Sequence, residues 1–340
     1  MRAIVLLITL LLSATAWAEE KGHYERVTAA GPSLAGNLAG DPADREVSVY
    51  LPADYAKQGS RRYNVLYLLH GFTDNDAQWF GRAGKHFVNV PEAVDSAVAA
   101  GVPGFIVVMP NALTRFGGSM YSNSAVNGDW ETFVSRDLVK FIDARYRTVA
   151  TPAGRGIAGH SMGGYGALRL AMKAPGVFGS VYAMSPCCLG ANLQPDARMF
   201  EGAQRIKSLD EIAASDFFTK AMLASAAAWS PNPKKPPLYI DLPYQDGKLV
   251  PEVVASQAAN APLAMFHQYV SALKGYKAIA IDSGDQDAFI APTVTQMHGL
   301  FDEYGIAHDY EIYEGDHLNR IHERLVGKVL PFFGRQFAAK

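Results

Sequence analysis

Cysteine is scarce in this sequence. Only two cysteines occur among 340 residues, and they are neighbours, Cys187 and Cys188. Adjacent cysteines cannot form a long-range disulfide within one chain, and two thiols without a nearby histidine cluster do not make a zinc site. We expect the pair to be small buried residues, with a strained vicinal disulfide as the alternative.

An excess of positive charge is also missing. Lysine and arginine number 31 against 33 aspartates and glutamates, which gives a formal net charge of −2. Such a balance provides no general attraction for nucleic acid or for an anionic membrane surface. We therefore expect neither as a partner.

The sequence has no apolar run long enough to span a bilayer, which takes about 20 residues. The apolar run from Ala3 to Leu12 follows Arg2 and precedes Ala16-Trp17-Ala18, a small-residue cleavage pattern. This arrangement predicts a signal peptide from Met1 to Ala18 and a single exported domain over residues 19–340. The mature protein is then periplasmic or secreted, without stable membrane insertion.

Metal and phosphate-binding motifs are absent as well. The sequence has no HExxH, and the stretch GRAGKH at 81–86 lacks the spacing of a phosphate-binding loop. We expect no cofactor and no catalytic metal.

What the sequence does contain is an alternation of short apolar runs with helical patterns. Several runs are continuously apolar, as in parallel strands that are covered on both faces. The expected strands are 46–52, 63–71, 104–112, 155–161, 179–186, 276–284 and 307–317, and the clearest helices are 129–146, 161–173 and 322–337. The pattern predicts an α/β fold with a mostly parallel central sheet and helices on both faces.

One stretch interrupts this alternation. Residues 189–237 are too long for a simple connection and contain a helical pattern around DEIAASDFFTKAMLASAAAW. We interpret them as a helical insertion over the sheet that forms a lid or pocket wall, with packing that never meets substrate as the alternative.

The motif GHSMGG, from Gly159 to Gly164, matches GxSxG and lies where a strand pattern changes to a helix pattern. A tight strand-to-helix turn of this kind presents a serine as a nucleophile, and its glycines prevent crowding. Ser161 is therefore the expected nucleophile, at a helix N-terminus that favours developing negative charge.

A serine hydroxyl needs a base to take its proton and a carboxylate to orient that base. In proteins with such a turn, the order along the chain is serine, acid, histidine. His317 follows the last expected strand and precedes the final helix, which is where the base belongs. His308 and His322 are better explained by packing or surface positions.

The acid should follow the preceding strand, which ends in DSGDQDAFI. Asp287 is the first choice and Asp285 the alternative, whereas Asp282 is still part of the strand. Asp241, in the segment IDLPY, is a distant third.

Two backbone N–H groups must stabilise the oxyanion of the reaction. Met162, the residue after the nucleophile, provides one, and Phe72 in the stretch LLHGFTDN provides the other, with Gly71 allowing close approach. Trp79, Tyr121 and Trp130 are candidates for the wall of an aryl or acyl pocket, although such aromatic residues are more often packing.

Several segments together resemble the putative-esterase group of α/β hydrolases, which includes esterase D (S-formylglutathione hydrolase), feruloyl and acetyl esterases, and mycolyltransferases. The similar segments are HGFTDNDAQWF, MYSNSAVNGDWETFVSRDL, GHSMGGYGAL, DSGDQDAFI and EGDHLNRIHE, within residues 46–337. The resemblance implies an α/β-hydrolase fold, a triad of Ser161, Asp287 and His317, and oxyanion donors at Phe72 and Met162. It does not extend to the insertion.

These observations predict an exported serine carboxylesterase that hydrolyses short-chain or aryl carboxylic esters, either small molecules or polysaccharide-linked esters. S-Formylglutathione is an unlikely substrate because it forms in the cytosol, whereas the signal peptide directs this chain out of it. One alternative is an acyltransferase that uses the same triad with an alcohol acceptor. A non-catalytic exported binding protein is the other, and the intact order of the triad argues against it.

Overall fold

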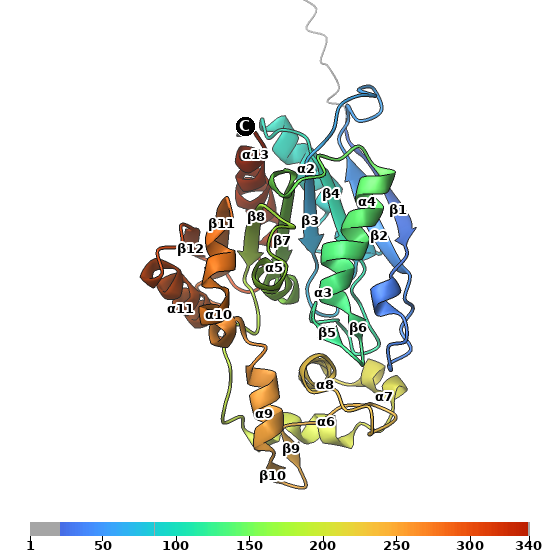
Figure 1. Ribbon diagram of the computed structural model, residues 1–340, viewed down its shortest axis with the longest axis vertical. Helices are drawn as coiled ribbons and strands as arrows, with labels where there is room; N and C mark the ends of the chain where they lie inside the picture. Colours follow the sequence, from blue (N-terminus) through green and yellow to red (C-terminus); the bar gives the residue numbers. More distant parts are fainter. Residues whose placement is uncertain (1–20, 85, 339–340) are drawn as a thin grey trace, which may run out of the picture.

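An eight-stranded sheet forms the centre of the protein, in the order β1-β2-β4-β3-β7-β8-β11-β12 (Figure 1). The computed structural model describes residues 21–84 and 86–338, so the predicted signal peptide from Met1 to Ala18 lies outside the described residues. The sheet strands are β1 His23–Ala29, β2 Arg45–Leu51, β3 Val65–Leu69, β4 Ile106–Pro110, β7 Arg155–His160, β8 Ser180–Met184, β11 Ala278–Gly284 and β12 Asp309–Tyr313. All strands from β4 to β12 along the sheet pair in parallel, and only β2 runs antiparallel to its neighbours.

The helices cover both faces of this sheet, as predicted. The main helices are α1 Asp76–Trp79, α2 Val90–Ala99, α3 Trp130–Thr132, α4 Val139–Arg145, α5 Met162–Lys173, α10 Pro262–Lys274, α11 Ala291–Glu303, α12 Ile321–Arg324 and α13 Leu330–Ala338. Side chains of β3 alternate between two hydrophobic cores: Val65 and Tyr67 pack with α4, α5, α10 and α11, whereas Leu66 and Leu68 pack with α2 and α13. Burial on both faces explains why this strand is continuously apolar.

The predicted long helices contain short π-helical segments. The segment Phe133–Leu138 joins α3 to α4, and Leu325–Val329 joins α12 to α13. The predicted helices 129–146 and 322–337 are therefore present, each with a local widening of the helix.

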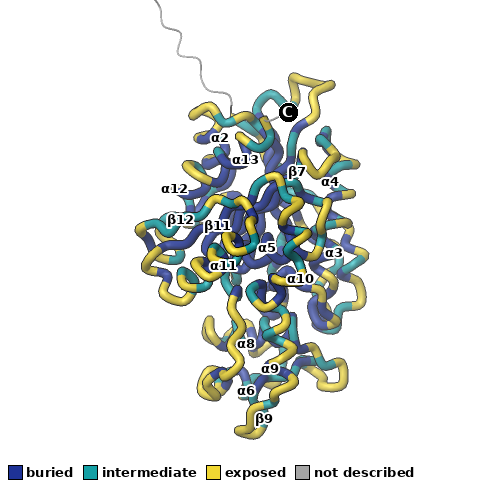
Figure 2. The backbone as a smooth tube through the Cα atoms, turned by 60° about the vertical axis from the view of Figure 1, so that its left-hand side comes forward, coloured by how far each residue is buried: buried dark blue, intermediate teal, exposed yellow. Residues whose placement is uncertain are grey.

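A separate group of short elements follows β8 and forms a cap. It contains a 3₁₀ turn at Ala197–Phe200, then α6 Glu201–Arg205, α7 Leu209–Ala214, α8 Phe217–Trp229, β9 Tyr244–Gln245, β10 Lys248–Leu249 and α9 Pro251–Ala258. Figure 1 shows the cap at the end of the molecule toward which β3 and β8 point. It has a small hydrophobic core of its own around Leu223 and Ala226, and much of its outer surface is exposed (Figure 2).

The predicted boundary of the insertion at 237 was too early. The chain remains in the cap through α9, which ends at Ala258. The proline-rich segment does not end the insertion. It forms a loop inside the cap, because the Asp241 N–H donates back to the carbonyl of Ser230. The antiparallel hairpin Asn123–Ser124 (β5) and Gly128–Asp129 (β6) lies beside the cap and contacts α8.

None of the helices within residues 21–84 and 86–338 combines the length and the apolar character that crossing a bilayer requires.

Candidate active site

Ser161 lies at a sharp turn between β7 and α5. Its backbone has φ 56° and ψ −115°, a conformation that residues other than glycine rarely adopt. The Ser161 N–H donates to the carbonyl of Met184 (3.0 Å), and the N–H of Cys187 donates to the carbonyl of Ser161 (3.1 Å). The neighbouring strand β8 and the residues after it therefore hold the strained turn in place.

The glycines of GHSMGG are required by close backbone contacts. A Cβ atom at Gly159 would lie 2.3 Å from the carbonyl carbon of Gly163, and one at Gly163 would lie 2.0 Å from the carbonyl oxygen of Leu69. The end of β3 and the start of α5 thus approach too closely for any side chain. The GxSxG spacing follows from this packing.

The structure brings Ser161, His317 and Asp287 into one chain of hydrogen bonds. Ser161 Oγ lies 2.9 Å from His317 Nε2, and His317 Nδ1 lies 2.5 Å from Asp287 Oδ2. A carboxylate can only accept, so Nδ1–H donates to Asp287 and leaves the Nε2 lone pair to accept the serine proton. This is the arrangement in which a histidine acts as a general base toward a serine.

The two other aspartates of the same segment have different partners. Asp285 Oδ1 accepts the N–H of Gly315 (3.0 Å), which braces the loop that carries His317. Asp282 is fully buried, where it accepts from Tyr182 Oη (2.7 Å) and from the Arg324 guanidinium. Asp241 lies in the cap and accepts from Asn232. Of the four candidates, only Asp287 reaches His317.

Two backbone N–H groups beside the serine turn have no protein acceptor among the described residues. In the part of the chain that the structure describes, neither the Phe72 N–H nor the Met162 N–H donates to a protein acceptor. Phe72 lies three residues after the end of β3, and Met162 is the first residue of α5. They are available to a developing oxyanion, so Phe72 and Met162 remain the predicted donors.

His70 fixes the peptide group that contains the Phe72 N–H. Its Nδ1–H donates to the Gly71 carbonyl (2.9 Å), and its Nε2 accepts the N–H of Ala112 (2.8 Å). The Gly71 carbonyl and the Phe72 N–H belong to the same planar peptide unit, so orienting one orients the other. Burial lowers the pKa of His70, which favours the neutral form that these two bonds require.

His160 has a similar positioning role toward His317. Its Nε2–H donates to the His317 carbonyl (2.9 Å), and the two rings are 4.7 Å apart between centroids. Burial lowers the pKa of His160 to about 3, so this ring is neutral at ordinary pH. Neither His70 nor His160 was predicted to have this role, although they lie within the motifs LLHGFTDN and GHSMGG.

The three aromatic residues proposed for a pocket wall are packing residues instead. Trp79 and Tyr121 have no exposed surface, and Trp130 is 1% exposed. Their polar atoms are also used internally: the Trp79 indole donates to Asp74, and the Tyr121 hydroxyl donates to the His70 carbonyl. Large aromatic residues pack readily inside a core, and the sequence pattern does not distinguish that burial from a pocket wall.

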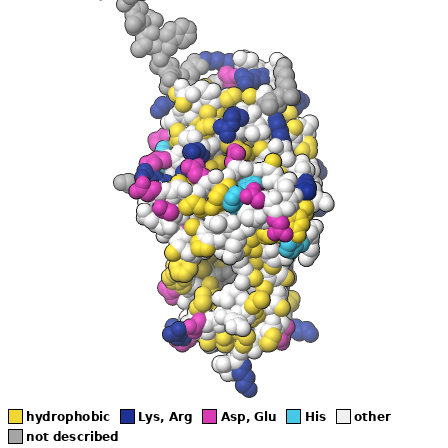
Figure 3. All heavy atoms as spheres, turned by 90° about the vertical axis from the view of Figure 1, so that its left-hand side faces the viewer, with side chains coloured by type: hydrophobic (Ala, Val, Ile, Leu, Met, Phe, Trp, Pro, Cys, Tyr) yellow, Lys and Arg dark blue, Asp and Glu magenta, His cyan; other side chains and the backbone are white. Residues whose placement is uncertain are grey.

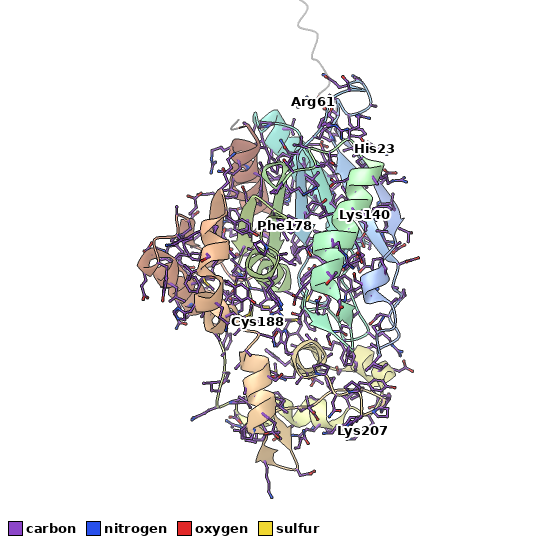
Figure 4. All side chains as sticks on the ribbon, in the orientation of Figure 1. His23, Arg61, Lys140, Phe178, Cys188 and Lys207 are labelled. Carbon is purple, nitrogen blue, oxygen red and sulfur yellow. The ribbon has the colours of Figure 1, made fainter. Side chains whose placement is uncertain are left out.

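The adjacent cysteines are linked to the serine turn by the hydrogen bond from the Cys187 N–H to the Ser161 carbonyl. Both thiols are free and half-buried, and the Cys188 thiol donates to Cys187 Sγ over 2.8 Å. The hydrogen bond from Cys188, together with burial, raises the pKa of the Cys187 thiol well above its usual range. Figure 4 shows Cys188 at the junction between the sheet domain and the cap.

Cys188 also lines a cavity of about 210 Å³ where the cap joins the sheet domain. Its other walls include Met199 and Phe200, Met222 and Trp229 from the cap. The cap also contacts the predicted oxyanion loop, because the rings of Phe217 and Phe72 pack edge to face, 5.6 Å apart between centroids.

A second, open apolar hollow lies beside His317 and is bordered by Phe87, Phe289 and Leu318. Figure 3 shows hydrophobic side chains along the narrow part of one face, between the body and the cap.

The buried neutral histidines predict a loss of stability in acid. The pKa of His160 is about 3 in the folded protein and that of His70 is lowered too, whereas an unfolded histidine titrates near 6.5. Between these values the unfolded chain binds protons that the folded chain does not. Their contribution to the free energy of unfolding is therefore complete above about pH 6.5 and falls by up to about 1.4 kcal/mol per pH unit for each histidine as the pH decreases.

Urea unfolding between pH 7 and pH 5 tests this expectation. The variant His160→Asn should lose less stability per pH unit than the wild type, and the control His267→Asn, at an exposed histidine, should match the wild type. An unchanged slope in His160→Asn would show that His160 does not contribute to acid sensitivity.

The sheet, the strained serine and the hydrogen-bonded histidine and aspartate define an α/β hydrolase with a serine site. The chain belongs to the family described as "Putative esterase", whose model matches residues 42–323. The predicted fold class and the predicted family are both confirmed.

Three relatives illustrate the similarity. An esterase of Mycobacterium tuberculosis is 42% identical over 146 residues, which is 41% of this chain and 28% of that protein. S-Formylglutathione hydrolase of Bos taurus is 29% identical over 160 residues, 42% of this chain and 51% of that enzyme. The solved structure of a ferulic acid esterase superimposes with a TM-score of 0.64 at 23% identity, and the match covers 93% of this chain and 99% of that one. The chain spans about half or less of the length of these curated relatives.

Proposed function

We propose that this protein is an exported serine carboxylesterase that hydrolyses short-chain or aryl carboxylic esters through an acyl-enzyme. The observation that carries the proposal is the continuous contact from Ser161 Oγ through His317 to Asp287. Membership of an esterase family supports the reaction class. Export rests on the pattern of Met1 to Ala18.

The reaction follows from the geometry. His317 Nε2 takes the proton of Ser161 as Oγ attacks the ester carbonyl carbon, and the Phe72 and Met162 N–H groups stabilise the oxyanion. The oxyanion then collapses, the bond to the alcohol oxygen breaks, and His317 returns its proton to the departing alcohol. Water enters next and gives a proton to His317 as it attacks the acyl carbon. The bond from that carbon to Ser161 Oγ then breaks, His317 returns the proton to Ser161 Oγ, and the carboxylic acid departs. Asp287 holds the imidazole and stabilises its charged form throughout.

The cavity under the cap suits a small or single-ring acyl group. Cys188 lines it, and the preceding residue, Cys187, is hydrogen-bonded to Ser161, so the cavity lies close to the nucleophile. Its volume of about 210 Å³ corresponds to roughly seven water molecules, at about 30 Å³ each in the liquid. Thioether and aromatic walls favour an apolar occupant. A long fatty acyl chain exceeds this space.

A panel of esters tests the proposal. We expect kcat/KM to be high for acetyl, butyryl and feruloyl esters and to fall sharply for a palmitoyl ester. S-Formylglutathione should be a poor substrate. A clear preference for this thioester would contradict the proposed substrate class, and absence of turnover across the panel would contradict the proposed activity.

The cap cavity itself is tested in the same panel with Ser225→Phe, because Ser225 lines the cavity on α8. The added ring should reduce kcat/KM for butyryl and feruloyl esters by about tenfold or more, while the acetyl ester changes little. The matched control is Ala255→Phe, at an exposed position of α9 that does not line the cavity. Equal effects on all esters would contradict the assignment of this cavity to the acyl group.

A further inference from the structure

A second cluster of ligand-type side chains lies near the start of β12, whereas the triad histidine follows the end of this strand. His298 and Asp302 stand one helical turn apart on α11, and His308 precedes β12. One ring nitrogen from each histidine and a carboxylate oxygen of Asp302 all lie within 4.8 Å of one another. His317 follows the same strand at its other end, so this cluster is separate from the proposed active site.

The hydrogen bonds of His308 determine which nitrogen it presents. Its Nδ1–H donates to the carbonyl of Ile306 (2.8 Å), so Nε2 carries a lone pair. This Nε2 lies 2.8 Å from His298 Nδ1. A histidine held by a carbonyl through one nitrogen, with the other nitrogen free, is the usual arrangement of a metal ligand.

Both ring nitrogens of His298 face groups that accept a hydrogen. Its Nδ1 must carry a hydrogen to meet the lone pair of His308, and its Nε2 lies 3.4 Å from a carboxylate oxygen of Asp302, which also requires a hydrogen. Neutral imidazole has only one N–H, so it satisfies one of these contacts. A cation that takes the place of the hydrogen between His298 Nδ1 and His308 Nε2 leaves the single N–H of His298 on Nε2, where it faces Asp302.

The rings are already held in place. The His298 ring stacks on Tyr310 at 3.9 Å with an interplanar angle of 3°, and the Tyr310 hydroxyl lies 3.0 Å from the hydroxyl of Thr295. The ring of Phe301 packs edge-on against His308, 4.8 Å away. Binding therefore requires little ordering of the imidazoles.

We propose that His298, His308 and Asp302 form a zinc-binding site. Two imidazole nitrogens and one carboxylate oxygen are typical ligands of Zn²⁺, with water in the fourth position of a tetrahedral site. The ion replaces the hydrogen between the two rings, and any proton released passes to water. The position between α11 and the start of β12 gives the ion a stabilising role, because it ties the helix to the edge strand.

Isothermal titration of the untagged, chelator-treated protein with zinc sulfate tests the site. We expect one Zn²⁺ per chain and a rise in Tm of a few degrees at saturating zinc. His308→Ala should weaken zinc binding at least 100-fold, and Asp302→Ala should weaken it about 10- to 100-fold. His267→Ala, at an exposed histidine on α10, is the matched control and should bind zinc like the wild type.

Ester hydrolysis by His308→Ala should stay within about twofold of the wild type, since the cluster does not touch the triad. If His308→Ala fails to fold, His298→Asn and Asp302→Ala give the same readout. Absence of stoichiometric zinc binding would overturn the proposal, as would binding that survives in His298→Asn and His308→Ala.

Discussion

Replacement of Ser161 by alanine is expected to lower kcat for ester hydrolysis by about six orders of magnitude, as in other serine hydrolases that lose the nucleophile. The reason is that no other hydroxyl lies within hydrogen-bond distance of His317 Nε2 among the described residues. The residual rate should come from the oxyanion donors and substrate binding alone. Steady-state kinetics with a butyryl ester measures the effect.

The variant should fold, because its backbone turn is held by one hydrogen bond to the Met184 carbonyl and one from the Cys187 N–H, and the alanine retains both. Circular dichroism and urea unfolding check this point. Ser185→Ala is the matched control, since Ser185 is a buried neighbouring serine whose Oγ lies 3.4 Å from the Tyr313 hydroxyl. Substantial hydrolysis by a folded Ser161→Ala variant would exclude Ser161 as the nucleophile.

Asp287→Asn is expected to reduce kcat by about four orders of magnitude. Asparagine keeps the size of the side chain, but its amide group can donate to Nδ1 and thereby favours the wrong histidine tautomer. The hydrogen then moves to Nε2, where it blocks acceptance of the serine proton. Because Asp287 Oδ2 lies only 2.5 Å from His317 Nδ1, the substituted amide acts on this nitrogen without an intervening group.

Asp285→Asn is the matched comparison, two residues away in the same loop. Its Oδ1 accepts from the Gly315 N–H, and an asparagine oxygen can accept the same bond. We therefore expect a loss of no more than about tenfold. If Asp285→Asn proved far more damaging than Asp287→Asn, the acid would be assigned to the wrong residue.

The central strands and the strained turn at Ser161 could be predicted from sequence because their causes are local. Buried parallel strands such as β3 and β8 are continuously apolar, and the glycines around Ser161 are imposed by short backbone contacts that leave a fixed spacing. The order of the triad follows from the topology, so His317 and Asp287 could be placed by their position after successive strands. Strand β1 was missed because it is a half-exposed edge strand, with only Ala29 fully buried.

Other features depend on contacts between distant segments. Whether Trp79, Tyr121 and Trp130 face a pocket or a core depends on what packs over them, and the sequence does not show this. His70 bonds to the Gly71 carbonyl and to the distant Ala112 N–H, and His160 bonds to the distant His317 carbonyl. The sequence alone does not show these long-range partners. The cap continues to Ala258 because residues after the proline-rich loop pair back to those before it.

Covalent labelling tests the central claim most directly. The protein is treated with an organophosphonate, digested, and analysed by peptide mass spectrometry. We expect one phosphonyl group per chain on the peptide that contains Ser161, formed in parallel with the loss of ester hydrolysis. An adduct on a different serine, or full inactivation without any adduct on Ser161, would contradict the account.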